Sequence, residues 1–478
     1  MYKNILWGAG IILLFTVTSC DKIKDFRDTN IDQNQTTNPI PSALLTNVES
    51  LMGGNLGYDG GGVNTGAGLY AQYFSETQYT EVSRYNKPTY NYDGYYAGAI
   101  EDLYNIISYN SDPATAGNAA AFGSNNNQIA IARILKAHYV KFLTDAVGDL
   151  PYFDAFQGNK GAITPKYDAQ QAIYTDLLKE LKEAVEQFDN GLTVQGDIIF
   201  GGDVAKWKKY ANSLRMLIAL NMRKVDASTG QSEFNDALNN PAGVIDNNAD
   251  NVAIAYPGGV FPHPVYNYYV ITNRLDIAVS QTMTDQLTST NDPRGSVFAS
   301  SANGFPYGLK RDDAIAFSSA NSDWARLLAG PSTPNTSSWT LISAANIDLA
   351  RAEAAQLGWT SEDVTTLFQN GIQANFDQWG LGDASVYYGG LTPDAEQIAV
   401  QEWLAFYPNG LEGWDVYRRT GFPTLAPAPD QGNPVPRRTT YGTNDYSYNA
   451  SNVGAAAANY TVNGKPDSQW GRIWWDKQ

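Results

Sequence analysis

The sequence predicts a mainly α-helical protein whose helices are joined by long, ordered loops. Several long stretches repeat apolar residues at the 3.6-residue spacing of a helix that buries one face. Convincing strands are few along the 478 residues. The segments between the periodic stretches are rich in Gly, Pro, Asn and Ser but also carry aromatic side chains. Long loops within a compact protein are usually functional or disordered, and the aromatic residues favour loops that pack.

The first predicted helix begins near Pro41, since proline is well tolerated in the first turn of a helix. Three periodic stretches follow it, each expected to bury one apolar side. In the second of them, the charged residues within 179–183 mark the opposite, polar side. The apolar positions of the three stretches are Ala132, Leu135, Tyr139, Phe142 and Ala146; Ile173, Leu177, Leu181, Val185 and Phe188; and Trp207, Ala211, Leu214 and Ile218.

The second half of the chain contains further helices. Residues 342–357 are expected to form one, and residues 393–407 another that begins with Pro393 behind Thr392 as its cap. At least eight helices follow in total, and pairs of antiparallel helices would suit a helical-repeat core, although no fixed-period repeat is visible. A fourth periodic stretch has its apolar positions at Val364, Phe368, Ile372, Phe376 and Trp379. The long loops are expected at 111–127, 239–273, 291–340 and 422–450.

Composition narrows the kinds of partner. The net charge of −17 repels phosphate backbones, so nucleic acid is excluded as a partner. The chain has one cysteine and therefore no internal disulfide, and its 43% hydrophobic residues suffice for a large core. Thirty tyrosines and 11 tryptophans accompany only 17% charged residues. Aromatic faces beside hydroxyls and amides suit neutral polar ligands such as sugars or peptides.

The first 19 residues have the pattern of a bacterial secretory signal peptide. A short basic segment is followed by a nearly unbroken apolar run over residues 5–17, which is too short to span a membrane. Small residues then precede Cys20, the only cysteine, as in a lipobox. We expect cleavage before Cys20, acylation of its thiol, and a polar tether over residues 20–40. A surface this acidic has no basic patch for the membrane, so the lipid must provide the attachment.

Familiar enzyme motifs are absent or incomplete. The chain has two histidines and no HExxH or Cys/His cluster, so we expect no zinc site and no other metal or cofactor. It also lacks the GxSxG elbow of a serine hydrolase. Residues 66–71 resemble a dinucleotide fingerprint, but three glycines precede them where a strand is needed, which favours a loop entering a helix. Residues 246–251 resemble the start of a calcium loop without its glycine and glutamate, which favours a turn.

The second half of the chain resembles a known family. The resemblance rests on residues 401–414, which run directly into 415–423, and on 436–438 and 472–476. Residues 143–152 and 347–355 agree with it, and the match covers nearly all of the chain after Cys20 in the right order. Together these segments resemble the SusD/RagB family of nutrient-binding outer-membrane lipoproteins, in its second SusD-like subgroup.

The resemblance implies a core similar to tetratricopeptide repeats, formed by residues 41–478 as a single domain, with long loops that carry the ligand site. It implies a protein held by a lipidated cysteine at the outer membrane and facing the cell exterior. Family members are similar to a lid over a SusC-like TonB-dependent transporter and deliver oligosaccharides or peptides to it without chemistry. One departure is that Lys22 and Lys24 lie among the acidic residues that follow Cys20.

The resemblance also implies where a ligand binds. Residues 70–85 resemble a family segment beside the ligand face, in which Tyr70, Tyr73 and Phe74 fall on one helical stripe. Tyr79 and Tyr85 lie past the expected helix end among polar residues, and are expected to be exposed stacking platforms. The candidate ligand-binding residues are Tyr73, Tyr79, Arg84, Tyr85, Trp324 and Arg326, the two arginines as forked donors to ligand oxygens.

Several other large side chains are expected to be structural. Trp403, Trp414, Trp474 and Trp475 are assigned to the core or to loop anchors, and Arg418, Arg419, Arg437 and Arg438 to pairs with acidic loops rather than with ligand. Two alternatives stay open at this point. A surface glycoside hydrolase would use a carboxylate pair that is assembled in space and leaves no sequence signature. A helical scaffold or lid would bind only proteins.

Overall fold

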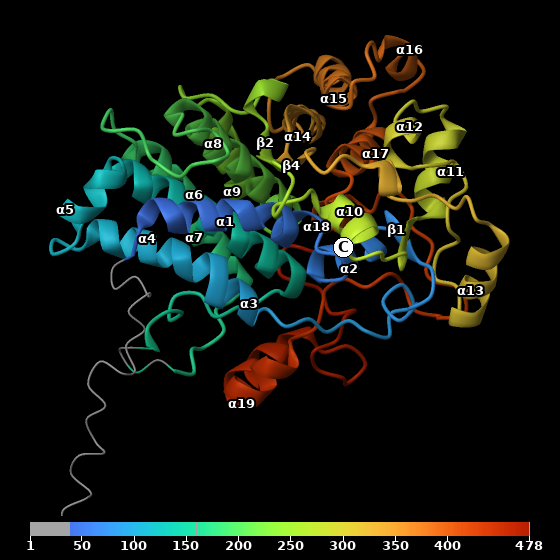
Figure 1. The fold of residues 1–478 in the computed structure, drawn as a ribbon, viewed down its shortest axis with the longest axis horizontal. Coiled ribbons are helices and arrows are strands. Elements are labelled where there is room, and N and C mark those ends of the chain that lie inside the picture. Colours follow the sequence, from blue (N-terminus) through green and yellow to red (C-terminus); the bar gives the residue numbers. More distant parts are fainter. Residues whose placement is uncertain (1–38, 159–160, 162, 478) are drawn as a thin grey trace, which may run out of the picture. The chain divides into compact units, whose positions relative to one another are not determined.

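A computed structural model describes residues 39–158, 161 and 163–477. The expected signal peptide, Cys20 and most of the expected tether lie outside these described residues. Residues Pro41–Gln478 form one compact unit. Its frame is a series of helices in which successive members pack side by side (Figure 1). The first members of this series are α1 (Pro41–Met52), α4 (Glu101–Ser111), α6 (Asn125–Val147), α7 (Gln170–Gln187), α8 (Val204–Asn221) and α9 (Ala227–Leu238).

Side-chain contacts give the direction of the helix pairs. Arg133 near the start of α6 pairs at 2.9 Å with Glu180 near the end of α7, while Gln170 at the start of α7 donates to the Thr144 carbonyl near the end of α6. The two helices are therefore antiparallel, as in a helical-repeat pair. A second group of helices continues the frame in the C-terminal part. It comprises α14 (Ala344–Gln356), α15 (Val364–Gln378), α17 (Ala395–Phe406) and α18 (Gly410–Thr420).

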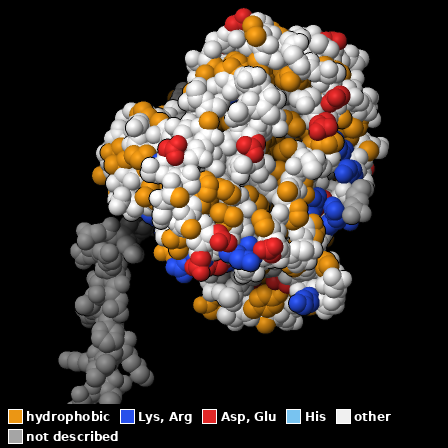
Figure 2. All heavy atoms as spheres, turned by 90° about the vertical axis from the view of Figure 1, so that its right-hand side faces the viewer, with side chains coloured by type: hydrophobic (Ala, Val, Ile, Leu, Met, Phe, Trp, Pro, Cys, Tyr) orange, Lys and Arg blue, Asp and Glu red, His pale blue; other side chains and the backbone are white. Residues whose placement is uncertain are grey.

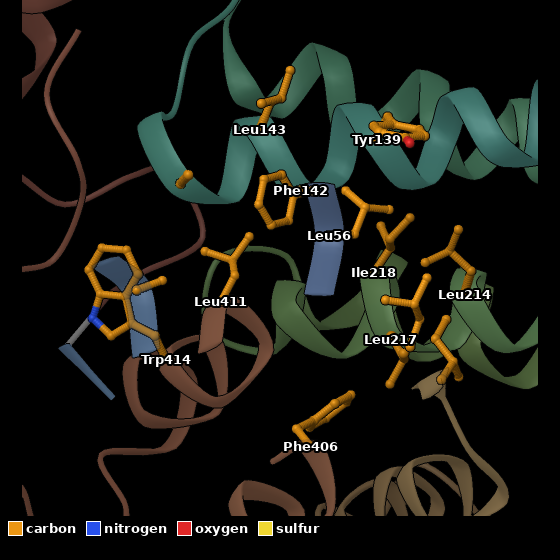
Figure 3. Packing of buried hydrophobic residues seen from close by; sticks show 14 of the residues in the cluster. Leu56, Tyr139, Phe142, Leu143, Leu214, Leu217, Ile218, Phe406, Leu411 and Trp414 are labelled. Atoms are coloured by element: carbon orange, nitrogen blue, oxygen red, sulfur yellow. The ribbon is translucent and has the colours of Figure 1, made fainter. Parts of the chain in front are cut away.

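The core lies where the two groups meet. Side chains of α6 and α8 point toward α18 and toward Leu56 in the turn after α1 (Figure 3). Phe142, Ile218 and Leu411 are each buried there. Each fully buried apolar side chain of this size contributes about 1.5–3 kcal/mol to stability, so the periodic stretches seen in the sequence add to the folding energy through their buried faces.

Two small antiparallel sheets fasten loops to this frame. Strand β1 (Phe74–Glu76) pairs with β3 (Ile277–Val279), with Phe74 opposite Val279. Strand β2 (Val252–Ala255) pairs with β4 (Ser338–Ile342) through a register shift next to Val252. Both pairs join segments far apart in the chain, so they position the loops between the helices rather than form a layer of their own.

The loops contain more helix than the sequence predicts. Helix α13 (Arg311–Ala320) lies inside the expected loop 291–340, and α19 (Thr443–Ala457) begins inside the expected loop 422–450 and extends beyond it. Single π-helical turns occur at Gly53–Gly57, Tyr96–Ile100 and Asn267–Ile271. The remaining short helices are α2 (Val63–Tyr70), α3 (Asp93–Tyr95), α5 (Ala116–Ala119), α10 (Pro264–Tyr266), α11 (Gln281–Ser289), α12 (Gly295–Phe298) and α16 (Ser385–Tyr388).

Three local predictions need correction. Residues 66–71 were expected as a loop entering a helix, but Gly66 and Gly68 lie within α2, where a side chain at Gly68 would strike the Phe74 ring. The expected stripe through Tyr73 and Phe74 is not helical, because α2 ends at Tyr70 and Phe74 begins β1. The cap of α17 is Asp394 and not Thr392, since the Asp394 carboxylate accepts the Gln397 N–H at 2.9 Å.

Candidate functional site

Three distant segments meet on the side of the molecule that carries α11 and α13. The β1–β3 pairing brings residues 74–85 beside the segment that ends in α13, and Arg84 donates to the Gly308 carbonyl at 2.7 Å. The Lys310 ammonium pairs with Asp430 at 3.1 Å and joins the third segment. Figure 2 shows this side, where acidic and basic side chains gather in a band across the lower part. We call the surface around Tyr79, Arg84, Lys310, Arg311 and Asp430 the Tyr79 face.

Tyr79 presents an aromatic ring on this face, as the sequence predicts. Its side chain is 48% exposed, and the Arg311 guanidinium lies 5.7 Å from the ring centroid. A cation at this distance from a tyrosine ring is attracted to it and holds it in place. The ring is therefore already positioned at the surface, and the guanidinium beside it can donate hydrogen bonds to ligand oxygens.

Three other candidates are buried and cannot stack on a ligand. Tyr85, expected to be an exposed platform, is 3% exposed, because its hydroxyl accepts the Ala428 N–H at 2.9 Å and a loop covers the ring. Tyr73 is fully buried against Trp403, with 4.9 Å between ring centroids, and its hydroxyl donates to the Trp403 carbonyl. Trp324 is 3% exposed in a small cluster with Phe305. All three side chains are therefore part of the protein interior.

The two candidate arginines are partly engaged in holding loops. Arg84 also donates to the Pro429 carbonyl at 3.3 Å. Arg326 stacks on Trp324, with its guanidinium carbon 4.2 Å from the ring centroid, and donates to the Trp324 carbonyl at 3.2 Å. Both are half-buried. Arginine carries five donors in a fixed fork, so positioning a loop and meeting a ligand are compatible roles.

The residues expected to be structural are so. Trp403, Trp414 and Trp475 are buried, and Trp474 packs half-buried against the core. Arg418 lies over Trp414, 3.8 Å from its ring centroid, and pairs with Asp415. The other pairs are Arg419 with Glu353 and Glu402, Arg437 with Asp476, and Arg438 with Asp467. Glu353, Glu402 and Asp415 lie on helices, so the expected pairing with acidic loops is correct only for Arg437 and Arg438.

The two histidines are enclosed in the protein interior. Burial lowers the pKa of His138 to about 3 and that of His263 to about 4, so both histidines are neutral and enclosed. The carboxylates of Glu353 and Glu402 are both buried and both pair with Arg419. Among the described residues, no group of three or more His, Cys, Asp or Glu side chains could hold a metal ion. Residues 246–251 form a turn. Lys209 of α8 pairs with two carboxylates of this turn, Asp246 at 3.0 Å and Asp250 at 2.7 Å.

Two open pockets lie outside the Tyr79 face, and sequence reasoning missed both. One, of about 600 Å³, is lined by mixed residues near α1 and α10, including Asn55, Asp59 and Arg274. The other, of about 550 Å³, lies against α3 and α19 and is lined by tyrosines. Both volumes are in the range of small-ligand sites. The tyrosine-rich stretches 90–96 and 446–448 were the available signal for the second pocket.

A helical frame that carries an exposed aromatic face and open pockets on its loops defines a binding protein. No helix in the described part of the chain is both long and apolar enough to cross a membrane. The chain belongs to the SusD-like_2 family, described as "Starch-binding associating with outer membrane", which matches residues 33–442. The resemblance seen in the sequence is thereby confirmed, and no curated protein matches the chain.

Solved structures agree with this assignment. A chitin-binding protein is 25% identical and superimposes with a TM-score of 0.75, covering 92% of this chain and 100% of its own. A SusD homologue from Bacteroides uniformis is 23% identical with a TM-score of 0.76, covering 92% and 99%. A chitin-binding SusD homologue from Flavobacterium johnsoniae is 24% identical with a TM-score of 0.73, covering 91% and 98%. The predicted mainly helical fold is therefore confirmed.

Proposed function

We propose that this protein captures glycans at the outer surface of the cell and delivers them to a SusC-like TonB-dependent transporter, without chemical change. A lipid on Cys20 would hold it to the outer membrane. Peptides are the second ligand class that the resemblance allows. The family description names starch binding and the outer membrane, and a similar structure is a chitin-binding protein.

The Tyr79 face is the observation that carries this proposal. Glycan recognition needs a flat apolar surface for one side of a sugar ring and polar groups for the hydroxyls at its edge. Tyr79 supplies the ring and Arg311 the adjacent donors. Arg84 holds the neighbouring loop through Gly308, which keeps this surface in place in the free protein. A surface prepared in this way loses little conformational freedom when it binds.

Replacing Tyr79 tests the proposal. We expect Tyr79→Ala to weaken glycan binding by about 1–3 kcal/mol, the range for a lost aromatic contact. Tyr79→Phe keeps the ring and should bind nearly as the parent does. Isothermal titration of the purified protein with maltoheptaose, chitohexaose, cellohexaose and a mixed peptide digest would identify the ligand class and measure the loss.

Tyr446→Ala is the matched control, because Tyr446 is 40% exposed on α19 and lies outside the Tyr79 face. Recovery of intact ligand after incubation would support capture, whereas shortened products would favour the surface glycosidase. Binding that is equal in the parent and Tyr79→Ala would place the ligand elsewhere. If no ligand of the panel binds but the protein co-purifies with a transporter, the scaffold alternative holds.

A further inference from the structure

The tyrosine-lined pocket beside α19 has the features of a second ligand site. Three segments line it: residues 92–101, residues 150–158 with 163–167, and residues 441–449, which include the first turns of α19. It shares no lining residue with the Tyr79 face as defined above. Its aromatic lining consists of Tyr92, Tyr96, Phe156, Tyr167, Tyr441 and Tyr448.

Hydrogen bonds within the protein fix most of these rings. The Tyr96 hydroxyl donates to the Pro151 carbonyl at 2.7 Å, and the Tyr167 hydroxyl to the Asp445 carboxylate at 2.6 Å. Tyr441 donates to the Asp149 carbonyl at 3.0 Å, and Tyr92 bonds Thr439. Tyr92 and Tyr441 are buried and form the base of the pocket. Tyr96 and Tyr167 are half-buried, and because their hydroxyl protons are already donated within the protein, they offer a ligand mainly their carbon surfaces.

Phe156, which lines the pocket, has an unusual backbone conformation. Its φ of 60° lies in the left-handed region, which bulky residues rarely occupy. The ring stacks on Tyr104, with 5.3 Å between centroids and 21° between planes, and lies 6.1 Å from Tyr96. A strained residue of this kind persists where the surroundings fix it, and such residues gather at ligand sites. Glycine would meet the same backbone demand at no cost.

The charged groups among the described residues that line the pocket are all carboxylates, and two amides, Asn444 and Asn449, accompany them. Asp93, Glu101 and Asp445 line it, and none of the described residues that line it is basic. The Asn444 amide donates to the Asp93 carboxylate at 2.9 Å, which orients one of these acids. An ionised carboxylate accepts hydrogen bonds and donates none. It therefore matches the hydroxyl and amine donors of a neutral or amino sugar, and repels a uronate or a sulfated sugar.

The mouth of the pocket is apolar and uncovered. Tyr448 is 78% exposed and Ile163 is 81% exposed, although both are large hydrophobic side chains. Their ring and alkyl surfaces continue the aromatic lining outward. A chain of sugar rings that enters the pocket would cover both.

We propose that this pocket is a second carbohydrate site, selective for neutral or amino-bearing sugar chains and distinct from the Tyr79 face. The ligand class rests on the proposed function, whereas the position and the charge preference rest on the pocket itself. Fixed aromatic surfaces would stack on the apolar faces of the sugar rings. The carboxylates of Glu101 and Asp93 would accept hydrogen bonds from the hydroxyl or amine groups at the edges of the sugar rings.

The test uses the protein with two pocket variants. Tyr448→Ala removes an exposed ring, and Phe156→Gly removes the stacked ring while relieving its backbone. Tyr446→Ala on the same helix is the control. The probes for isothermal titration are cellohexaose, chitosan hexamer and oligogalacturonate. We expect each pocket variant to weaken binding of a neutral or amino probe at least about tenfold at a site that Tyr79→Ala leaves unchanged, and the parent to reject oligogalacturonate there.

A charge change provides a second measurement that does not depend on the rings. Glu101 is exposed, so Glu101→Lys should fold, and it is expected to lower affinity for chitosan hexamer and to raise it for oligogalacturonate. Glu101→Gln removes the negative charge without reversing it, so it should change both affinities less than Glu101→Lys does. Sugar binding that responds to Tyr79→Ala and not to any pocket variant would overturn the second site while leaving the proposed function intact. No sugar binding at either place would overturn both, and pocket variants that impair only transporter binding would show a protein-docking surface instead.

Discussion

At the scale of single residues, one buried carboxylate holds the segment that presents Tyr79. The Glu76 side chain on β1 accepts the Ser83 N–H at 2.8 Å and the Ser83 hydroxyl at 2.7 Å. These two bonds close residues 76–83 into a loop with Tyr79 at its exposed part. Burial raises the pKa of Glu76 to about 7, although the bonds from Ser83 favour its charged form. The loop therefore contains a group that changes protonation near neutral pH.

Stability should depend on pH through Glu76. Its pKa is raised on folding, so its contribution is fully present below about 4.5 and is lost as the pH rises through about 7. In Glu76→Gln, whose amide oxygen can still accept from Ser83, the unfolding free energy should fall less steeply over this range. Between pH 4.5 and pH 8, the unfolding free energy of the parent should fall by on the order of 3 kcal/mol more than that of Glu76→Gln, since one pKa unit corresponds to about 1.4 kcal/mol.

Chemical denaturation at pH 4.5, 6 and 8 would measure this difference. Glu186→Gln is the control, because Glu186 is exposed on α7. Parallel curves for the parent and Glu76→Gln would mean that Glu76 remains charged in the folded protein.

Residue patterns predicted the candidate site only in part, for a physical reason. Tyr79 and Tyr85 both lie among polar neighbours, and this local setting decides exposure when nothing distant covers the residue. Nothing buries Tyr79, but Ala428, 343 positions further along the chain, bonds the Tyr85 hydroxyl and covers its ring. Trp324 is similarly buried by Phe305 and Ala278. Where residues distant in the chain decide whether a side chain is exposed, its exposure cannot be predicted from the sequence of the short segment around it.

At the scale of elements, glycines allow α2 and α18 to approach closely. Gly410 begins α18 directly over α2, and a side chain there would lie 2.6 Å from the Gly68 Cα and overlap the Asn64 carbonyl oxygen. These are backbone atoms, so a small side-chain adjustment cannot relieve the clash. The approach also lets the Asn64 side chain accept the Leu411 N–H at 2.7 Å.

We expect Gly410→Ala to lower the free energy of unfolding by at least about 1–3 kcal/mol, the range for an overpacked interior. Gly454→Ala is the matched change, because Gly454 lies exposed within α19 and a side chain there would meet nothing within 4 Å. That change should stabilise the protein by about 0.5–1 kcal/mol. Thermal or denaturant unfolding of both variants would check the opposite signs, and equal effects would contradict the close helix contact.

The helices that periodicity predicts are those that bury a long stripe. The expected helices at 342–357 and 393–407 are observed as Ala344–Gln356 and Ala395–Phe406. Helix α13 was missed because Ala314 is its one buried residue, so its sequence carries no stripe. The π-helical turn at Tyr96–Ile100 was missed for a related reason, since it is stabilised by contacts with residues far along the chain.

At the scale of the whole molecule, we propose that a lipid on the Cys20 sulfur fixes the position of the protein in the cell. Several acyl chains on this cysteine would anchor the protein firmly, because a single chain gives only reversible binding. We expect Cys20→Ser to move the protein from the membrane fraction to the soluble fraction. Ser19→Ala keeps a small residue before the cysteine and should remain in the membrane. Membrane retention of Cys20→Ser would point to a different attachment.

The contact between α2 and α18 has a consequence for the order of events during synthesis. Asn64 and Leu411 are 347 positions apart, and at the usual 5–20 residues per second the ribosome needs roughly 17–70 s to make the chain between them. Throughout that time α2 lacks its contact with α18, so this part of the fold cannot be completed. Under the export that we propose, the chain crosses a membrane before it folds, and this delay would keep it unfolded for that passage.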